Sequence, residues 1–226
     1  MSLGAYKAIE PRTLGRVLKA EINRDFTISS VTLAGGSGSA RVVELGEVLG
    51  QRIIGAAVGE ADGGNTGQGG IGSITRGVAC KVGVYALTCI AAASGGGRFQ
   101  VVDPDGFRLA DALVGVAYAS AQINFTIADG DPDFAVGDAF TITVAAGDRK
   151  YVALTPAAVD GSQHAARISA MNKEAPDATD VPLNVIDFGA LVNEAELVWP
   201  AGISADDKAA AVSRLAGRFI LTRAQA

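Results

Sequence analysis

One stretch decides the fold of this chain: Gly189-Ala-Leu-Val-Asn-Glu-Ala-Glu-Leu-Val-Trp-Pro-Ala-Gly-Ile-Ser-Ala-Asp-Asp-Lys208, which leads on to Gly217. Ser204 is a natural N-cap, and two aspartates follow it in the first turn of the helix it would begin. Residues 208–216 are good helix formers, and Gly217 stands where a left-handed residue ends a helix. We therefore predict a strand, a Trp-Pro corner, one short helix and a final strand at 218–222.

The composition predicts a β-protein with many turns. The 226 residues include 29 glycines and few aromatic residues, and runs of Val, Ile and Thr are frequent. A net charge of −5 argues against nucleic acid or a membrane surface as a partner. The amino terminus lacks the apolar core of a signal peptide, and the run 84–93 is too short for a membrane span, which needs about 20 residues. We expect a soluble protein made in the cytosol.

A change in composition divides the chain into three parts. Residues 51–148 hold 18 of the 29 glycines and ten acidic residues against five basic ones. We interpret them as an inserted β-domain, because a loop tip whose two ends stay close tolerates such an insertion. Residues 26–50 plus 149–226 then form a discontinuous core domain. Residues 1–25 lack a regular spacing of apolar residues and carry a local charge of +2, so we predict an extended amino-terminal arm with a strand at 17–22.

Short β-patterns with strong turn signals recur in both predicted domains. In the insert they predict a small β-sandwich or barrel with strands at 82–90, 98–103, 113–118, 122–128 and 139–145, after a loose glycine-rich stretch at 60–72. In the core domain they predict strands at 26–33, 41–45, 47–49, 151–154, 165–170 and 181–188.

Two motifs with chemical meaning are better explained as turns or loops. Gly67-Gln-Gly-Gly-Ile-Gly72 matches a dinucleotide fingerprint, but a polar loop precedes it and a β-like run follows where the fingerprint needs a strand and a helix. Asp129-Gly-Asp-Pro-Asp133 has the first three ligand positions of a calcium loop, but Phe134 and Phe140 replace the required Gly and Glu. We predict no cofactor and no metal site.

The remaining reactive residues form no catalytic pattern. His164 has no Cys or acidic residue at triad spacing, and we interpret it as a surface histidine. Glu194 and Glu196 alternate with apolar residues, which indicates the solvated face of a strand. Cys80 and Cys89 are expected to be reduced, buried thiols, although a single bridge between strand neighbours stays open. We expect no enzymatic activity.

Three blocks of this sequence resemble the head decoration proteins of lambda-type tailed phages. The closing stretch resembles the carboxy-terminal part of that family, with a Gly-led strand, a Trp-Pro, an acidic-capped helix and a final Ala-Gly strand. A second block resembles the family's segment of strand, Asp-Gly turn and strand: Lys150-Tyr-Val-Ala-Leu-Thr-Pro-Ala-Ala-Val-Asp-Gly-Ser-Gln-His-Ala-Ala-Arg-Ile168. Val43-Glu-Leu-Gly-Glu-Val-Leu-Gly50 resembles the segment that normally precedes that block directly. The insert of 98 residues between these two blocks is a departure from the family pattern.

The resemblance implies a capsid-cementing protein with a β-clip-like core. Members form trimers on the outside of the mature capsid, at threefold and quasi-threefold positions, where their amino-terminal arms bind the major capsid protein. It implies a virion location on the outer capsid surface. We expect the capsid-binding residues of the arm to be Tyr6, Lys7, Arg12, Arg16, Lys19 and Arg24, and Trp199, Pro200 and Ser204 to be structural anchors.

Two alternatives stay open at this point. The inserted domain, residues 51–148, could bind a host-surface glycan, although no aromatic cluster marks a sugar platform. The chain could also be another virion β-protein, such as a tail component.

Overall fold

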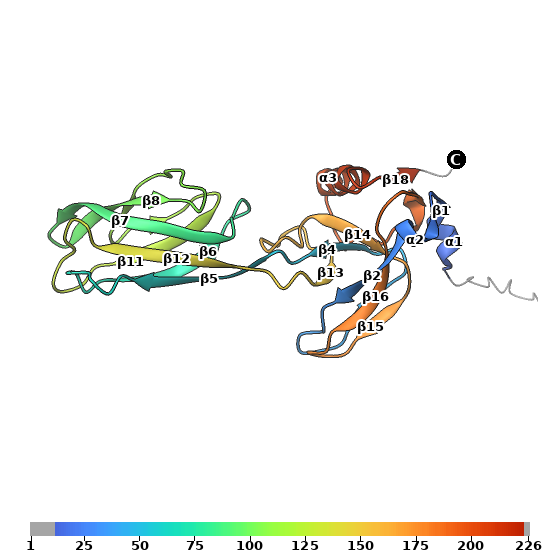
Figure 1. Ribbon diagram of the computed structural model, residues 1–226, viewed down its shortest axis with the longest axis horizontal. Helices are drawn as coiled ribbons and strands as arrows, with labels where there is room; N and C mark the ends of the chain where they lie inside the picture. Colours follow the sequence, from blue (N-terminus) through green and yellow to red (C-terminus); the bar gives the residue numbers. More distant parts are fainter. Residues whose placement is uncertain (1–11, 224–226) are drawn as a thin grey trace, which may run out of the picture. The chain divides into compact units, whose positions relative to one another are not determined.

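The computed structural model describes residues 12–223, which form two compact units. The core unit consists of the described residues up to Gln51, Lys150–Pro156, and the described residues from Ser162 onward. The insert unit consists of Arg52–Arg149 and Ala157–Gly161. Both units are mainly β, and one helix longer than a single turn lies near the carboxyl end of the described chain (Figure 1). The prediction of a mainly β fold with one short carboxy-terminal helix is confirmed.

A closed barrel forms the first half of the core unit. Its order is β13 (Tyr151–Ala153), β2 (Ile28–Leu33), β16 (Val181–Ile186), β14 (Ala165–Ser169) and β4 (Val48–Gln51). A separate pair, β3 (Arg41–Val43) and β15 (Lys173–Ala175), is antiparallel. Closure leaves the barrel strands without open edges, which satisfies their backbone groups internally.

A three-stranded sheet forms the second half of the core unit. Its order is β1 (Leu18–Glu21), β17 (Ala190–Asn193) and β18 (Ile220–Arg223), so that β1 is an edge strand. The single turns α1 (Leu14–Val17) and α2 (Arg24–Thr27) flank β1 in the chain, and the 3-10 turn η1 (Glu194–Glu196) follows β17. The helix α3 (Ala205–Ala216) contributes Leu215 to the hydrophobic cluster that also holds Val17, Val192 and Ile220.

Two sheets enclose the core of the insert unit. The larger has the order β5 (Ile54–Ala61), β12 (Ala139–Ala146), β7 (Gly83–Ala93), β8 (Gly96–Val102) and β9 (Ala112–Leu113). The smaller has the order β10 (Ala117–Tyr118), β11 (Ile123–Ala128) and β6 (Gly70–Arg76). Alternate residues of β7, β11 and β12 are buried, as expected of strands with one face on a core. Phe99, Phe134 and Phe140 meet in that core with ring centroids 5.1 to 5.6 Å apart.

The expected extended arm needs correction within the described residues. Residues 14–27 fold as α1, β1 and α2, and β1 pairs with β17. Val17 and Leu18 are buried in the core, so their burial holds the segment to the unit. Residues 157–161, which the sequence pattern predicts to belong to the core, lie in the insert unit. The Asp160 carbonyl accepts hydrogen bonds there from the amides of residues 53 and 54, at 2.8 and 2.9 Å.

Four local expectations were wrong. Residues 194–196 form η1 rather than a strand, because the Asn193 side chain accepts from the Ala195 amide and caps the turn. Gly217 has a φ of −59°, and Phe219, at +59°, makes the left-handed reversal that brings Ile220 into the buried sheet. The expected strand 113–118 is divided between β9 and β10. The glycine-rich stretch 60–72 is loose only between the end of β5 and the start of β6.

Other expectations about the insert unit are confirmed. Asp103-Pro-Asp-Gly106 is a turn, in which the Asp103 carboxylate accepts from the amides of Asp105 and Phe107. The Lys81 ammonium lies 2.6 Å from the other oxygen of Asp103 and, helped by the amides and the Gln122 side chain, holds the pKa of that carboxyl at about 2. Cys80 and Cys89 are buried free thiols, and burial raises the pKa of each.

Candidate functional site

The amino-terminal segment meets the core unit at a cluster of charges that we call the arm root, made of Arg12, Arg16 and Glu196. Two nitrogens of Arg16, Nε and Nη2, donate to Glu196 Oε1 at 3.1 and 2.8 Å. Arg12 Nε lies 3.5 Å from Glu196 Oε2, and Arg12 Nη1 donates to the Leu45 carbonyl at 3.2 Å. Each carboxylate oxygen of Glu196 therefore faces one arginine.

The arm root is tightly packed on the turn before β4. Gly46 has a φ of +86°, and a Cβ atom there would lie 2.6 Å from the Glu196 carbonyl oxygen and 3.2 Å from Val17 Cγ2. Glycine is therefore required at this turn for the arm and η1 to approach so closely. The Val198 amide completes the contact by donating to the Gly46 carbonyl at 2.9 Å.

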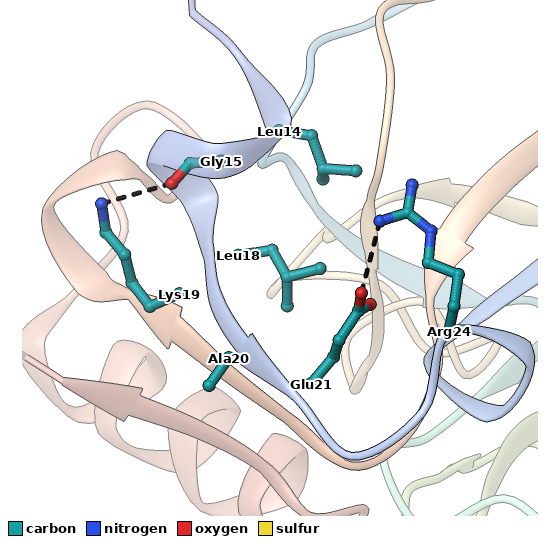
Figure 2. Close-up of a pocket in the computed structure, with 7 residues that line it drawn as sticks. All are labelled: Leu14, Gly15, Leu18, Lys19, Ala20, Glu21 and Arg24. Carbon is teal, nitrogen blue, oxygen red and sulfur yellow. Dashed lines mark hydrogen bonds and ion pairs between the residues drawn. The ribbon is translucent and has the colours of Figure 1, made fainter.

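A groove of 340 Å³ lies along β1 between α1 and α2. Figure 2 shows the side chains of Leu14 and Leu18 pointing into it, with the Glu21 and Arg24 ion pair beside them. Glu21 and Arg24 are 3.5 Å apart, and Lys19 Nζ donates to the Gly15 carbonyl at 3.3 Å on another side of the strand. The groove thus combines apolar walls with a charged rim.

A second groove, of 280 Å³, crosses the three-stranded sheet beside Gly189 and is mostly apolar. Ile22, Phe219 and Leu221 line it and are 76%, 61% and 52% exposed. Phe188 packs edge-on against Phe219 with ring centroids 5.2 Å apart. Exposed apolar side chains gathered in this way are typical of a surface that contacts another protein.

The expected arm residues lie in different surroundings. Tyr6 and Lys7 are outside the described residues. Arg12 and Arg16 belong to the arm root and contact Glu196, while Lys19 and Arg24 border the groove along β1. The structure therefore separates two cations that are held within the chain from two that stand at an exposed rim.

The expected structural anchors surround the start of α3. The Ser204 hydroxyl accepts from the Asp207 amide at 3.0 Å and donates to its carboxylate at 2.7 Å. Trp199, next to Pro200, is half-buried against the core cluster, and its Nε1 is buried with no hydrogen-bond partner among residues 12–223. Lys208 Nζ lies 5.4 Å from the centre of the Trp199 ring, within range of a cation–π contact.

The other motifs stay separate from this site. β6 begins within Gly67–Gly72, so a strand occupies the place where a dinucleotide fold needs a helix. Among residues 12–223, no three or more His, Cys, Asp or Glu side chains are grouped to hold a metal ion. Within the same residues, no helix is both long and apolar enough to cross a bilayer.

His164 is half-buried rather than fully exposed, which predicts a pH-dependent stability. Burial, and then the nearby charge of Arg214, lower its pKa below the usual value. Above pH of about 6.5 both folded and unfolded chains hold a neutral imidazole, and below it the unfolded chain binds the proton more readily. We expect the free energy of unfolding to fall between pH 7 and 5.5, and His164→Gln to flatten that decline in urea titrations. Identical pH profiles of the unfolding free energy for the wild type and for His164→Gln would contradict this account.

Sequence reasoning missed two parts of the site. The alternation with apolar residues predicts a solvated strand face for Glu196. Its partner Arg16 is 180 residues away in the chain, so no local pattern joins the two. The apolar groove draws Ile22 and Leu221 together from opposite ends of the chain. The exposure of large apolar residues is visible only once the strands are paired.

This chain is similar to one protein family and, more weakly, to two solved structures. The model of the family described as "Bacteriophage lambda head decoration protein D" matches residues 8–220. No curated protein sequence matches the chain. Two crystal structures of FlgL from Xanthomonas campestris are similar to 44% of this chain, with 21% and 24% sequence identity and TM-scores of 0.34 and 0.33. The similar part spans only 33% and 32% of those FlgL chains.

The family match, by contrast, covers nearly the whole chain. It begins before the arm root, runs through the insert unit and ends at the first residue of β18. The protein therefore belongs to the bacteriophage lambda head decoration protein D family.

Proposed function

We propose that the protein is a structural component of the phage head that binds the outside of the mature capsid as a homotrimer. The trimers sit at threefold and quasi-threefold positions, contact the major capsid protein and stabilise the shell. The observation that carries this proposal is the family match over residues 8–220. Many copies that each make modest contacts stabilise a shell collectively, so the role is mechanical and needs no catalytic centre.

The surface around the arm root supports the proposal. The rim of the groove along β1 offers exposed Lys19 and Arg24, and β1 is an edge strand to which another chain can pair. The apolar groove with Ile22 and Phe219 adds a surface suited to burial against protein. We assign contact with the capsid to this region together with the residues that precede Arg12.

The insert unit has a different character, and we propose that it points away from the shell into solvent. Residues 51–148 carry ten acidic and five basic residues, which favours solubility. The alternative that these residues bind a host-surface glycan stays a prediction.

Binding of the labelled full-length chain to purified phage parts tests the proposed function. We expect saturable binding to mature heads that lack the protein and none to tails. We also expect light scattering to give three times the chain mass of 22.8 kDa. Binding to tails alone would instead support a tail component, and binding to neither would contradict decoration.

A further inference from the structure

We propose that Glu196 is the positioning residue of the arm, and that Arg12 and Arg16 act on capsid binding through Glu196 rather than by touching the capsid. This inference rests on the proposed function, because it assumes that residues preceding Arg12 bind the shell. It concerns how the chain directs those residues. The arm root would fix the point and direction at which the arm leaves the core unit.

Glu196 is held firmly enough for this role. It ends η1, which the Asn193 side chain caps, and the next residue, Leu197, is buried in the core. The Glu196 side chain is only 16% exposed, so its attraction to the arginines is less screened than that of a surface pair. Its backbone carbonyl is fixed against the Gly46 turn. The carboxylate is therefore a rigid anchor for a segment arriving from the far end of the chain.

The two arginines are committed to this anchor. Arg16 uses two guanidinium nitrogens on one oxygen, a charge-assisted arrangement that is stronger than neutral hydrogen bonds. Arg12 lies between Glu196, the Leu45 carbonyl and Glu44, whose Oε2 is 3.6 Å from Arg12 Nη1. To bind the capsid directly, either arginine would have to give up these contacts.

Lys19 and Arg24 contrast with them. Lys19 Nζ donates to the Gly15 carbonyl of its own local turn at 3.3 Å, and Arg24 pairs with Glu21 three residues away at 3.5 Å. Both residues are exposed, and contacts of this kind contribute little to stability. These two cations can turn to an external partner at small cost. The sequence-based set of arm cations thus divides into positioning residues and candidate contact residues.

The expected effect follows from the conformational freedom that a chain segment loses when it binds a partner. An arm that already leaves in the bound direction loses less conformational freedom when the capsid holds it. Opening the arm root should therefore weaken binding by about fivefold for each arm, the change that corresponds to one modest ion pair. The folded core should persist, because Val17 and Leu18 remain buried whether or not Arg16 is paired.

A double-mutant cycle on the full-length chain tests the proposal, with Arg16→Ala, Glu196→Ala and the double variant measured for binding to purified mature heads. We expect Arg16→Ala to bind at least about fivefold more weakly, because every arm of the trimer carries the change, and Glu196→Ala to bind at least as weakly as that, because it also releases Arg12. The double variant should be no worse than Glu196→Ala alone. Glu194→Ala is the matched control, because Glu194 lies in the same turn but pairs with Lys208 of α3 at 3.2 Å. It should bind as the wild type does.

Direct contact of Arg16 with the capsid predicts a different pattern. Glu196→Ala would then release Arg16 and leave binding unchanged or stronger, while Arg16→Ala alone would weaken it. That pattern, or additive losses in the double variant, would overturn the proposal.

Hydrogen exchange of the amides at 12–17 gives an independent readout. Exchange should be faster in Arg16→Ala and in Glu196→Ala, and unchanged exchange would equally overturn the proposal. A wild-type chain that bound no heads would refute the proposed function, whereas the exchange measurement would still decide whether the arm root holds the segment.

Discussion

Removal of residues 1–11 is expected to lower the affinity of the protein for mature heads by about 100-fold or more, while the core unit stays folded. The loss is large because three arms would bind one site together, and linked contacts lose their combined affinity when all are removed. The deletion must stop before Arg12. Residues beyond it include the buried Val17 and Leu18 and the strand β1, whose removal would damage the sheet with β17.

Head-binding titrations of the shortened and full-length chains measure the effect, with circular dichroism and the oligomer mass as checks on folding. Lys19→Ala in the full-length chain serves as a milder comparison, because it removes one rim cation and leaves the arm. Equal affinity of the shortened and full-length chains would show that the arm does not bind the capsid.

Gly50→Val is expected to destabilise the core unit by about 3 kcal/mol or more, because overpacking at this point cannot be relieved by side-chain movement. Gly50 lies in β4 between β13 and β14. A Cβ atom there would lie 2.2 Å from the Ser162 carbonyl oxygen and 2.7 Å from its Cα, and both are backbone atoms of a buried residue. Valine would therefore force the barrel apart at that contact.

Urea unfolding followed by tryptophan fluorescence measures this effect in the core unit, because Trp199 is the single tryptophan of the chain. Gly15→Ala is the control, since a Cβ placed there would meet no atom within 4 Å from the rest of the described chain beyond its own turn, and we expect a change within about 1 kcal/mol. An unfolding midpoint of Gly50→Val equal to that of the wild type would refute the packing argument.

Much of the fold could be predicted because its signals are local. The N-cap of α3 follows from the hydroxyl of Ser204 and the amide three residues on, and the structure shows that bond. Strands with one buried face, such as β7 and β12, reveal themselves by alternation. Turn residues such as those at 103–106 also mark strand ends by a local signal, their own preference for turns.

The rest depended on contacts that the linear sequence does not display. The arm root could not be predicted, because Arg16 and Glu196 meet only after β1 has paired with β17. The sequence predicts the left-handed reversal at Gly217, because glycine prefers positive φ, but the reversal lies at Phe219, because the burial of Ile220 depends on tertiary packing. β6 was hidden by its glycines, whose lack of side chains weakens any β-pattern.

The location of the protein on purified heads tests its function as a capsid decoration protein most directly. In a symmetry-averaged electron-microscopy reconstruction of heads that carry the protein, we expect three copies on the outside of each threefold and quasi-threefold position. The core unit should contact the shell, and the insert unit should point outward. Density on the inner surface, at other positions, or only on the tail would contradict the account.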